Sequence, residues 1–166
     1  MKISKYYNLV LAALFASMIF VLTFFVKIPA PLGYIHLGDS AIYLAASLLP
    51  TPYAIAAAGI GGAMADVAGG YWAFVPVTFI VKILLALVFS SKGEHVLGFR
   101  NIIAPIICFA ITVFGYFAFE IFYYGNAAYY EMLLNLIQAV GSAIVYYLFA
   151  AVFDGAKLKN RFATAG

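Results

Sequence analysis

Long apolar runs, separated by short segments rich in glycine, proline or charge, dominate the order of residues along this chain. A helix that crosses the hydrocarbon core of a bilayer needs about 20 residues, with a range of about 17–25. Backbone polar groups at that depth must be satisfied within the structure, which favours helices. The runs therefore predict an all-α integral membrane protein with six spanning helices, over residues 7–26, 36–49, 53–68, 74–89, 102–124 and 132–152.

The six runs differ in how well they fit a membrane span. The first, fifth and sixth are long enough, whereas the second, third and fourth are short. The first run follows Lys2 and Lys5, as in a signal peptide, but it continues to Val26, too far for a typical signal. We therefore interpret it as a retained helix within a single membrane domain that covers residues 1–166.

Composition supports a protein that lives in a bilayer. Hydrophobic residues make up 67% of the 166 residues and charged residues 9%, and the mean hydropathy is +1.07. A soluble domain has about 25% charged residues, so this chain has too few polar side chains to cover a surface in water. The net charge of +3 is small. These values exclude a soluble globular domain, a disordered chain and a nucleic-acid-binding protein.

The positive charges predict the orientation of the helices. If both termini are cytoplasmic, seven Lys and Arg residues lie inside, Lys27 alone lies outside, and Lys82 lies within the fourth run. Cytoplasmic loops of membrane proteins carry an excess of such residues, so this arrangement is favoured. The seven are Lys2, Lys5, Lys92, Arg100, Lys157, Lys159 and Arg161.

Polar side chains within the predicted helices gather in the outer half of the membrane. At about 1.5 Å per residue, Lys82 lies roughly 12 Å into its helix and Glu120 roughly 6 Å below the outer end of its own. Asp39 and Asp66 stand at the outer boundary. Polar groups in a membrane helix are costly, which makes each a candidate for function.

The sixth run adds polar residues to the same region. Asn135, Gln138 and Ser142 follow the spacing i, i+3 and i+7 and therefore share one helix face. The inner halves of the runs contain almost no charge. A proton or ion pathway needs polar groups along its whole length, so the pattern predicts a cup that opens outwards instead of a continuous channel.

Several of these residues also have a purely structural interpretation. Lys82 and Glu120 can form a structural ion pair, and Asn135 and Gln138 can join helices by hydrogen bonds. Asp39 in the sequence Gly-Asp-Ser can serve as a helix N-cap.

The remaining candidates lie in loops or carry little chemical signal. A single loop histidine such as His36 is often incidental, although it titrates near neutral pH. Tyr34, Tyr71 and Trp72 fit either an interfacial aromatic belt or the stacking of a ligand ring. Cys108 is the only cysteine, so it favours neither a disulfide nor a metal cluster. No phosphate-binding or metalloprotease motif is present, so we expect no enzyme and no cofactor held by this chain.

Three sequence blocks together point to a known family. They are Gly33–Asp39 (GYIHLGD), Gly59–Asp66 (GIGGAMAD) and Pro76–Lys82 (PVTFIVK). In combination they resemble the substrate-binding S components of energy-coupling factor (ECF) vitamin transporters, and the resemblance covers nearly the whole chain. Within that family the chain is most similar to the subunits assigned to hydroxymethylpyrimidine or pyridoxine.

The resemblance implies a site, partners and a location. The pocket would lie between the first loop, Lys27–Gly38 with Pro29, Pro31 and Gly33, and the outer parts of the fourth to sixth helices. The loaded subunit would dock, in a bacterial cytoplasmic membrane, on a transmembrane T component with two cytoplasmic ATPases that bind the ATP. The substrate-binding candidates are Glu120, Lys82, Asn135, Gln138, His36, Asp39, Asp66 and Trp72.

The partner-docking candidates are Ala12 and Ala16, which match the family's small-xxx-small motif but also suit packing within the protein itself. Other functions stay open as alternatives. These are a stand-alone secondary transporter, a structural membrane protein, and an S component for riboflavin, thiamine or a queuosine precursor.

Overall fold

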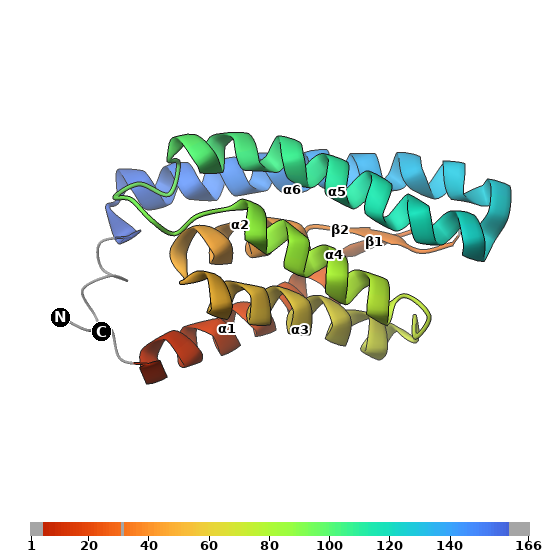
Figure 1. The fold of residues 1–166 in the computed structure, drawn as a ribbon, viewed down its shortest axis with the longest axis horizontal. Coiled ribbons are helices and arrows are strands. Elements are labelled where there is room, and N and C mark those ends of the chain that lie inside the picture. The colour runs from red at the N-terminus through yellow and green to blue at the C-terminus, as the bar shows by residue number, and fades with distance from the viewer. Residues whose placement is uncertain (1–4, 31, 160–166) are drawn as a thin grey trace.

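The computed structural model describes residues 5–30 and 32–159, which form six α-helices and one short hairpin (Figure 1). Helix ends differ from the predicted ones by at most four residues, the largest difference being the start of the last helix, 128 against 132. The elements are α1 (Lys5–Phe24), β1 (Lys27–Pro29), β2 (Tyr34–His36), α2 (Gly38–Leu48), α3 (Thr51–Gly69), α4 (Val75–Val88), α5 (Phe99–Tyr124), the 3-10 turn η1 (Gly125–Ala127) and α6 (Ala128–Gly155).

The helices form a bundle with two distinct ends. Helix α1 packs against α3, α3 against α4, and α5 against α6, while α2 contacts α1, α3, α4 and α6. Helix α1 begins and α6 ends at one end of the bundle, and the opposite end carries the α3–α4 turn and η1 (Figure 1). Local signals fix that turn, because Gly70 adopts the left-handed conformation (φ 80°) after α3 and Pro76 lies in the first turn of α4.

Two adjacent glycines let α3 approach both of its neighbours. A Cβ on Gly61 would lie 2.7 Å from the carbonyl oxygen of Ala16 in α1, and one on Gly62 would lie 2.7 Å from Cγ of Lys82 in α4. Any side chain at either position would collide with its neighbour. The glycines of the third run therefore serve close helix packing.

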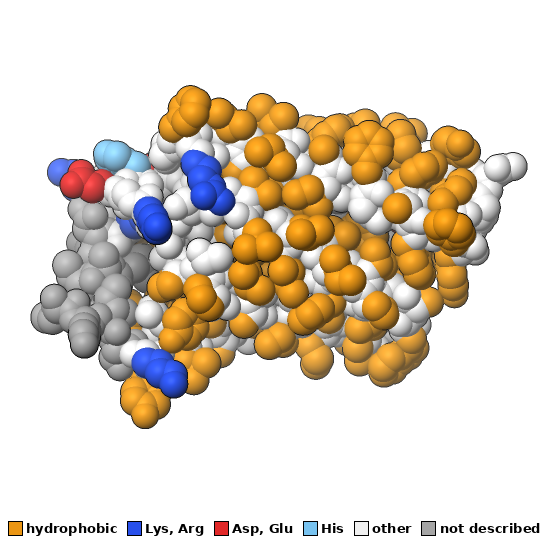
Figure 2. Space-filling model, viewed as in Figure 1, with side chains coloured by type: hydrophobic (Ala, Val, Ile, Leu, Met, Phe, Trp, Pro, Cys, Tyr) orange, Lys and Arg blue, Asp and Glu red, His pale blue; other side chains and the backbone are white. Residues whose placement is uncertain are grey.

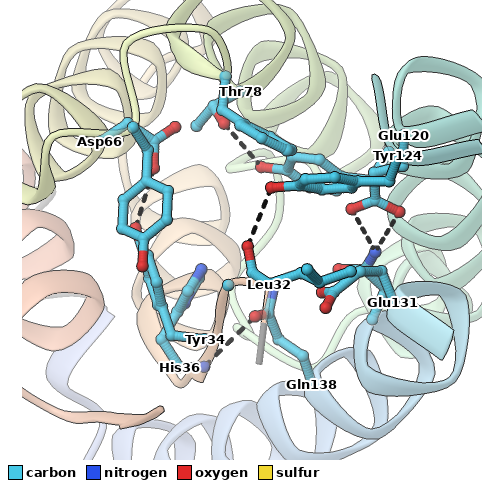
Figure 3. Close-up of a pocket in the computed structure, with 14 residues that line it drawn as sticks. Leu32, Tyr34, His36, Asp66, Thr78, Glu120, Tyr124, Glu131 and Gln138 are labelled. Carbon is cyan, nitrogen blue, oxygen red and sulfur yellow. Dashed lines mark hydrogen bonds between the residues drawn. The ribbon is translucent and has the colours of Figure 1, made fainter. Parts of the chain in front are cut away.

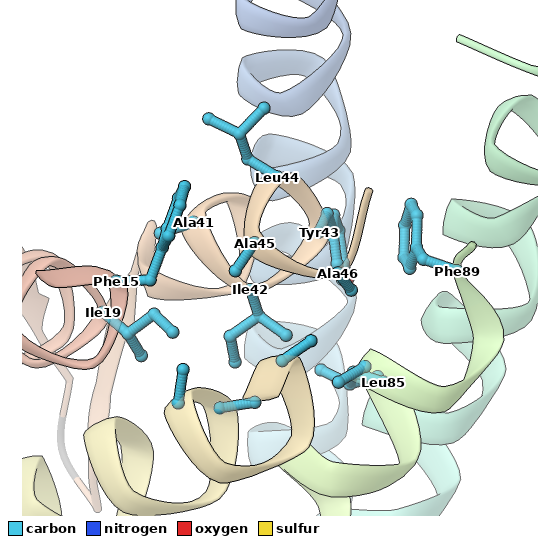
Figure 4. Packing of buried hydrophobic residues seen from close by; sticks show 14 of the residues in the cluster. Phe15, Ile19, Ala41, Ile42, Tyr43, Leu44, Ala45, Ala46, Leu85 and Phe89 are labelled. Atoms are coloured by element: carbon cyan, nitrogen blue, oxygen red, sulfur yellow. The ribbon is translucent and has the colours of Figure 1, made fainter. Parts of the chain in front are cut away.

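Helix α2 differs from a spanning helix. Its 11 residues extend for only about 16 Å, and all but Leu48 are buried. Figure 4 shows Ile42 between Ile19 of α1 and Leu85 of α4. The second predicted span is thus corrected to a short helix in the interior of the bundle, which is too short to cross a bilayer alone.

Large hydrophobic side chains cover much of the outer surface. Phe122 is 90% exposed, and Ile106 and Leu148 are similarly open. In Figure 2 the charged side chains of the visible face gather at the end where α1 begins, and the rest of that face is largely apolar. Two helical stretches within the described residues are long and apolar enough to cross a membrane, Lys5–Phe24 and Phe99–Gly155, and α4 is a shorter apolar helix. Such a surface is typical of contact with lipid.

The β1–β2 hairpin corrects the all-α expectation. It occupies the segment expected to be an irregular loop, and the bond from the Ala30 amide to the Gly33 carbonyl closes its turn. Three residues named in the predictions lie outside the described residues, namely Lys2, Pro31 and Arg161. The cytoplasmic orientation of the termini stays a prediction. The antiparallel pairs are Lys27 with His36, Ile28 with Ile35, and Pro29 with Tyr34.

Candidate functional site

A cavity lies between the hairpin, the α3–α4 turn and the ends of α5 and α6 (Figure 3). It contains about 480 Å³ of atom-free space, part of it open to solvent, and about 60 Å³ is available to the centres of water molecules. One buried water needs about 10–15 Å³ of the latter volume, so the cavity has room for a few waters. Its lining is Leu32, Gly33, Tyr34, His36, Asp66, Tyr71, Phe74, Thr78, Tyr116, Glu120, Tyr124, Glu131, Asn135 and Gln138.

The hairpin forms the roof of this cavity, and three hydrogen bonds hold it to three different helices. The roof can lift only if these bonds break, and we call them its latches. The bonds run from Tyr34 Oη to Asp66 Oδ1 of α3 (2.9 Å), from Tyr124 Oη of α5 to the Leu32 carbonyl (3.0 Å), and from the His36 amide to Gln138 Oε1 of α6 (3.3 Å).

Two groups in the roof keep fixed protonation states. Burial and the neighbouring carboxyl of Asp66 raise the pKa of Tyr34 above its ordinary value, so its hydroxyl stays a donor. Burial and the charge of Lys82 lower the pKa of His36 to about 3. Geometry agrees, because His36 Nδ1 accepts a hydrogen bond from the amide of Gly38 (3.1 Å) and therefore carries no proton.

The wall of the cavity joins α5 to α6 and α4. Nδ2 of Asn135 donates to both carboxyl oxygens of Glu120, at 3.1 and 3.3 Å. Oη of Tyr116 donates to Oγ1 of Thr78 at 3.1 Å. These bonds hold the polar groups of the wall in place before any ligand arrives.

Two carboxyl oxygens in the lining have no hydrogen-bond partner among the described residues, Oδ2 of Asp66 and Oε1 of Glu131. Both residues are only 6% exposed. A buried acceptor without a partner costs about 1–3 kcal/mol. These atoms are therefore the ones best placed to accept hydrogen bonds from a bound molecule.

Lys82 and Asp39 lie beside the cavity without lining it. Nζ of Lys82 is 2.6 Å from Oδ1 of Asp39, and Nε2 of Gln138 donates to Oδ2 of Asp39 at 3.2 Å. Two interpretations are thereby corrected. Lys82 does not pair with Glu120, and Asp39 is no N-cap, because Leu37 holds that position without a side-chain bond. Asp39 is also fully buried.

Trp72 is corrected as a binding candidate. Its side chain is 67% exposed and does not line the cavity. The adjacent Tyr71 does, with its ring centroid 5.2 Å from that of Tyr34. The tight turn after α3 directs neighbouring side chains apart, which sequence position alone does not reveal. Ser142 of the predicted polar face lies outside the lining and is buried without a hydrogen-bond partner among the described residues.

The structure brings together five of the eight predicted binding residues and adds others that were missed. Glu131 is four residues before Asn135, so extending the polar face of α6 by one turn would have found it. Tyr116 and Tyr124 flank Glu120 at the same spacing of four on α5. The five that meet at the cavity are Glu120, Asn135, Gln138, His36 and Asp66.

The small residues of α1 face in two directions. Ala12 is buried in the hydrophobic core, and Ala16 is half-buried beside Gly61 of α3. Ala12 thus packs within the protein, which corrects it as a docking residue, whereas Ala16 also lines a surface groove between α1 and α3. The residues that follow each of them, Ala13 and Ser17, are exposed.

Comparisons with known proteins agree with a substrate-binding membrane subunit. Residues 3–154 match the family model described as ECF-type riboflavin transporter, S component. A Pyrococcus woesei protein, described as an uncharacterized protein in the gap 3′ region, is 31% identical over 123 residues, which are 72% of this chain and 82% of that protein. S components are membrane proteins that bind the substrate of a transporter and are not enzymes, and in general they assemble with a T component and ATPases. The match over nearly the whole length shows that this chain belongs to the ECF-type riboflavin transporter S component family.

Proposed function

We propose that this chain captures a small heteroaromatic vitamin or vitamin precursor, of the hydroxymethylpyrimidine or pyridoxine class, from outside the cell. The observation that carries the proposal is the roofed cavity, whose lining combines aromatic rings with buried polar groups. Aromatic side chains stack on planar rings, and a few fixed polar groups set the orientation of a ligand. The rings are Tyr34, Tyr71, Phe74, Tyr116 and Tyr124.

The size of the cavity favours a single-ring ligand. With the hairpin latched, only about 60 Å³ is available to water centres, so any vitamin must displace the roof to some degree. A pyrimidine or pyridine ring requires a smaller displacement than the three fused rings and sugar-like chain of riboflavin. Riboflavin is the second candidate, because the family match carries that name.

The wider transport cycle follows from family membership. We propose that the loaded subunit docks, in the cytoplasmic membrane, on a T component with two ATPases that supply the energy. The docking surface that we propose is the groove between α1 and α3, where small residues allow a helix of the T component to approach closely. The groove is lined by Ala16, Ser17, Phe20, Val21, Ile60, Gly61 and Met64.

Ligand binding by the purified protein tests the proposal. Native mass spectrometry should detect a co-purified small molecule, and calorimetric titration should show binding of hydroxymethylpyrimidine or pyridoxine. Replacement Glu120→Gln removes a carboxyl group that lines the cavity. The loss of one hydrogen bond from the ligand to such a group is worth about 1.5–3 kcal/mol, so affinity should fall roughly ten- to hundredfold.

Trp72→Phe is the matched control, because Trp72 does not line the cavity. This variant should bind the vitamin with the affinity of the unchanged protein. Absence of binding of all three vitamins, riboflavin included, by folded protein would overturn the proposal. Coupled uptake by this chain alone in vesicles, without ATPases, would instead establish the secondary-transporter alternative.

A further inference from the structure

The lining of the cavity carries acidic side chains and, apart from one histidine, no basic ones among the described residues. Asp66, Glu120 and Glu131 all contribute carboxyl groups to it, and none of the described residues that line it is Lys or Arg. The nearest buried cation is Lys82, whose ammonium group is committed to Asp39 at 2.6 Å. Lys82 is thus paired with a residue outside the lining, although its charge and that of Lys27 still act on Asp66 over a longer distance.

None of the three carboxyl groups forms a salt bridge within the described residues. Glu120 receives hydrogen bonds from the neutral amide of Asn135, and Asp66 receives one from the phenol of Tyr34. One oxygen of Asp66 and one of Glu131 receive none. The two salt bridges within the described residues both lie elsewhere.

His36 does not change this balance. Its Nδ1 accepts the hydrogen bond from the Gly38 amide, which leaves the imidazole neutral. The described residues also contain no group of three His, Cys, Asp or Glu side chains arranged to hold a metal ion. The pattern of acceptors therefore fits an organic cation or an amino group better than an inorganic ion.

The aromatic lining favours the same chemistry. The face of a tyrosine or phenylalanine ring is negative, and a cation within about 6 Å of it is attracted. Removing a carboxyl group from water is costly unless a counter-charge and hydrogen bonds replace the water. A ligand that donates hydrogen bonds and carries positive charge supplies both.

We infer that this cavity selects a six-membered heteroaromatic ring that bears a positive charge or an amino group, which the carboxyl groups of Glu131 and Asp66 receive. The inference rests on the proposed function, because it concerns the ligand of the same cavity. The inference adds a requirement on the charge of the ligand, and this requirement distinguishes rings of otherwise similar size and shape. A ring of the same size that has neither a positive charge nor an amino group can donate only through its hydroxyl groups and supplies no counter-charge to the two carboxyl groups.

Two matched pairs of compounds test the inference by calorimetric titration of the full chain in detergent at neutral pH. Pyridoxamine differs from pyridoxine by an ammonium group in place of a hydroxyl. Hydroxymethylpyrimidine differs from its hydroxyl analogue by an amino group on the ring. In at least one pair the amino compound should bind more than tenfold more tightly than its partner.

Substitution then assigns the preference to the cavity. Glu131→Gln keeps the shape and removes the charge, so the two members of the pair should bind within about twofold of each other. Glu94→Gln changes an exposed carboxyl group outside the cavity lining and should preserve the preference. Gel filtration and thermal unfolding confirm that each variant is folded.

The outcomes separate the inference from the function on which it rests. Equal binding within both pairs, or tight binding of riboflavin with neither pair bound, would overturn the selection of a cation and leave vitamin capture intact. A preference that persists in Glu131→Gln would also overturn the assignment. Absence of binding of every compound by folded protein would overturn the proposed function and the inference with it.

Discussion

Nζ of Lys82 in α4 lies 2.6 Å from Oδ1 of Asp39 in α2, and the two side chains are 1% and 0% exposed. Gln138 of α6 extends this pair, because its amide donates to Asp39 while its oxygen accepts from the His36 amide in the roof. The buried ion pair therefore joins α2 to α4, and Gln138 connects the pair to the roof of the cavity.

Removing one partner of this pair should destabilise the protein strongly. Lys82→Met leaves Asp39 buried without a counter-charge, and such changes cost about 3–5 kcal/mol. The double replacement Lys82→Met with Asp39→Leu removes both charges and should recover most of the loss. Thermal unfolding in detergent measures this, and equal destabilisation by the single and double variants would show that the pairing contributes little.

Loosening one latch of the roof should accelerate the release of ligand. Tyr34→Phe removes the hydrogen bond to Asp66, a bond to a charged group worth about 1.5–3 kcal/mol. Dissociation followed by stopped-flow fluorescence should become roughly ten- to hundredfold faster. Tyr6→Phe, at an exposed position of α1, is the control and should leave the rate unchanged. An unaltered rate in Tyr34→Phe would mean that this latch does not limit opening.

Acid should weaken ligand binding through His36. Its pKa is about 3 beneath the closed roof and would return to about 6.5 when the roof opens. Below pH 6.5 the open form therefore takes up a proton that the closed form excludes, so the closed form loses stability as pH falls from about 6.5 to 3. For a ligand over which the roof closes again after binding, affinity should drop by up to about tenfold per pH unit between pH 6 and 4.

The groups that face His36 do not all act in the same direction. Lys82 of α4 and Lys27 of β1 oppose its protonation, whereas Asp39 of α2 favours it. His36→Asn keeps an acceptor for the Gly38 amide and does not titrate, so its pH profile contains only the contribution of the other groups. If the affinity of this variant fell with pH as steeply as that of the unchanged protein, protonation of His36 would not be the cause of the weaker binding in acid.

A bulky residue in the α1–α3 groove should separate ligand capture from transport. Ser17 lines that groove and is exposed, so Ser17→Trp should preserve ligand affinity while uptake by cells with the complete complex falls severalfold or more. Ile106→Trp, on an exposed position of α5, should affect neither. Ala12→Trp should lower both, because Ala12 is buried. Normal uptake with Ser17→Trp would exclude this groove as the docking surface.

The sequence by itself determined the class of protein and the position of its helices. The length of an apolar run, and the proline, glycine or charged residues that end it, are local properties of the sequence. The helix ends were therefore predicted to within four residues. Helical spacing likewise placed Asn135 and Gln138 on one face, and both line the cavity. The same spacing, extended by one turn, reaches Glu131.

Only the tertiary structure decided which residues meet. Lys82 and Asp39 are 43 residues apart, and depth in the membrane alone did not distinguish Asp39 from Glu120 as the partner of Lys82. Hydrophobic periodicity did not show that Ala12 faces the core and Ser17 the outside, because lipid-facing and core-facing positions are equally apolar. The hairpin that roofs the cavity has strands of three residues, too short for an alternating pattern to reveal, and it is held by hydrogen bonds to helices far along the chain.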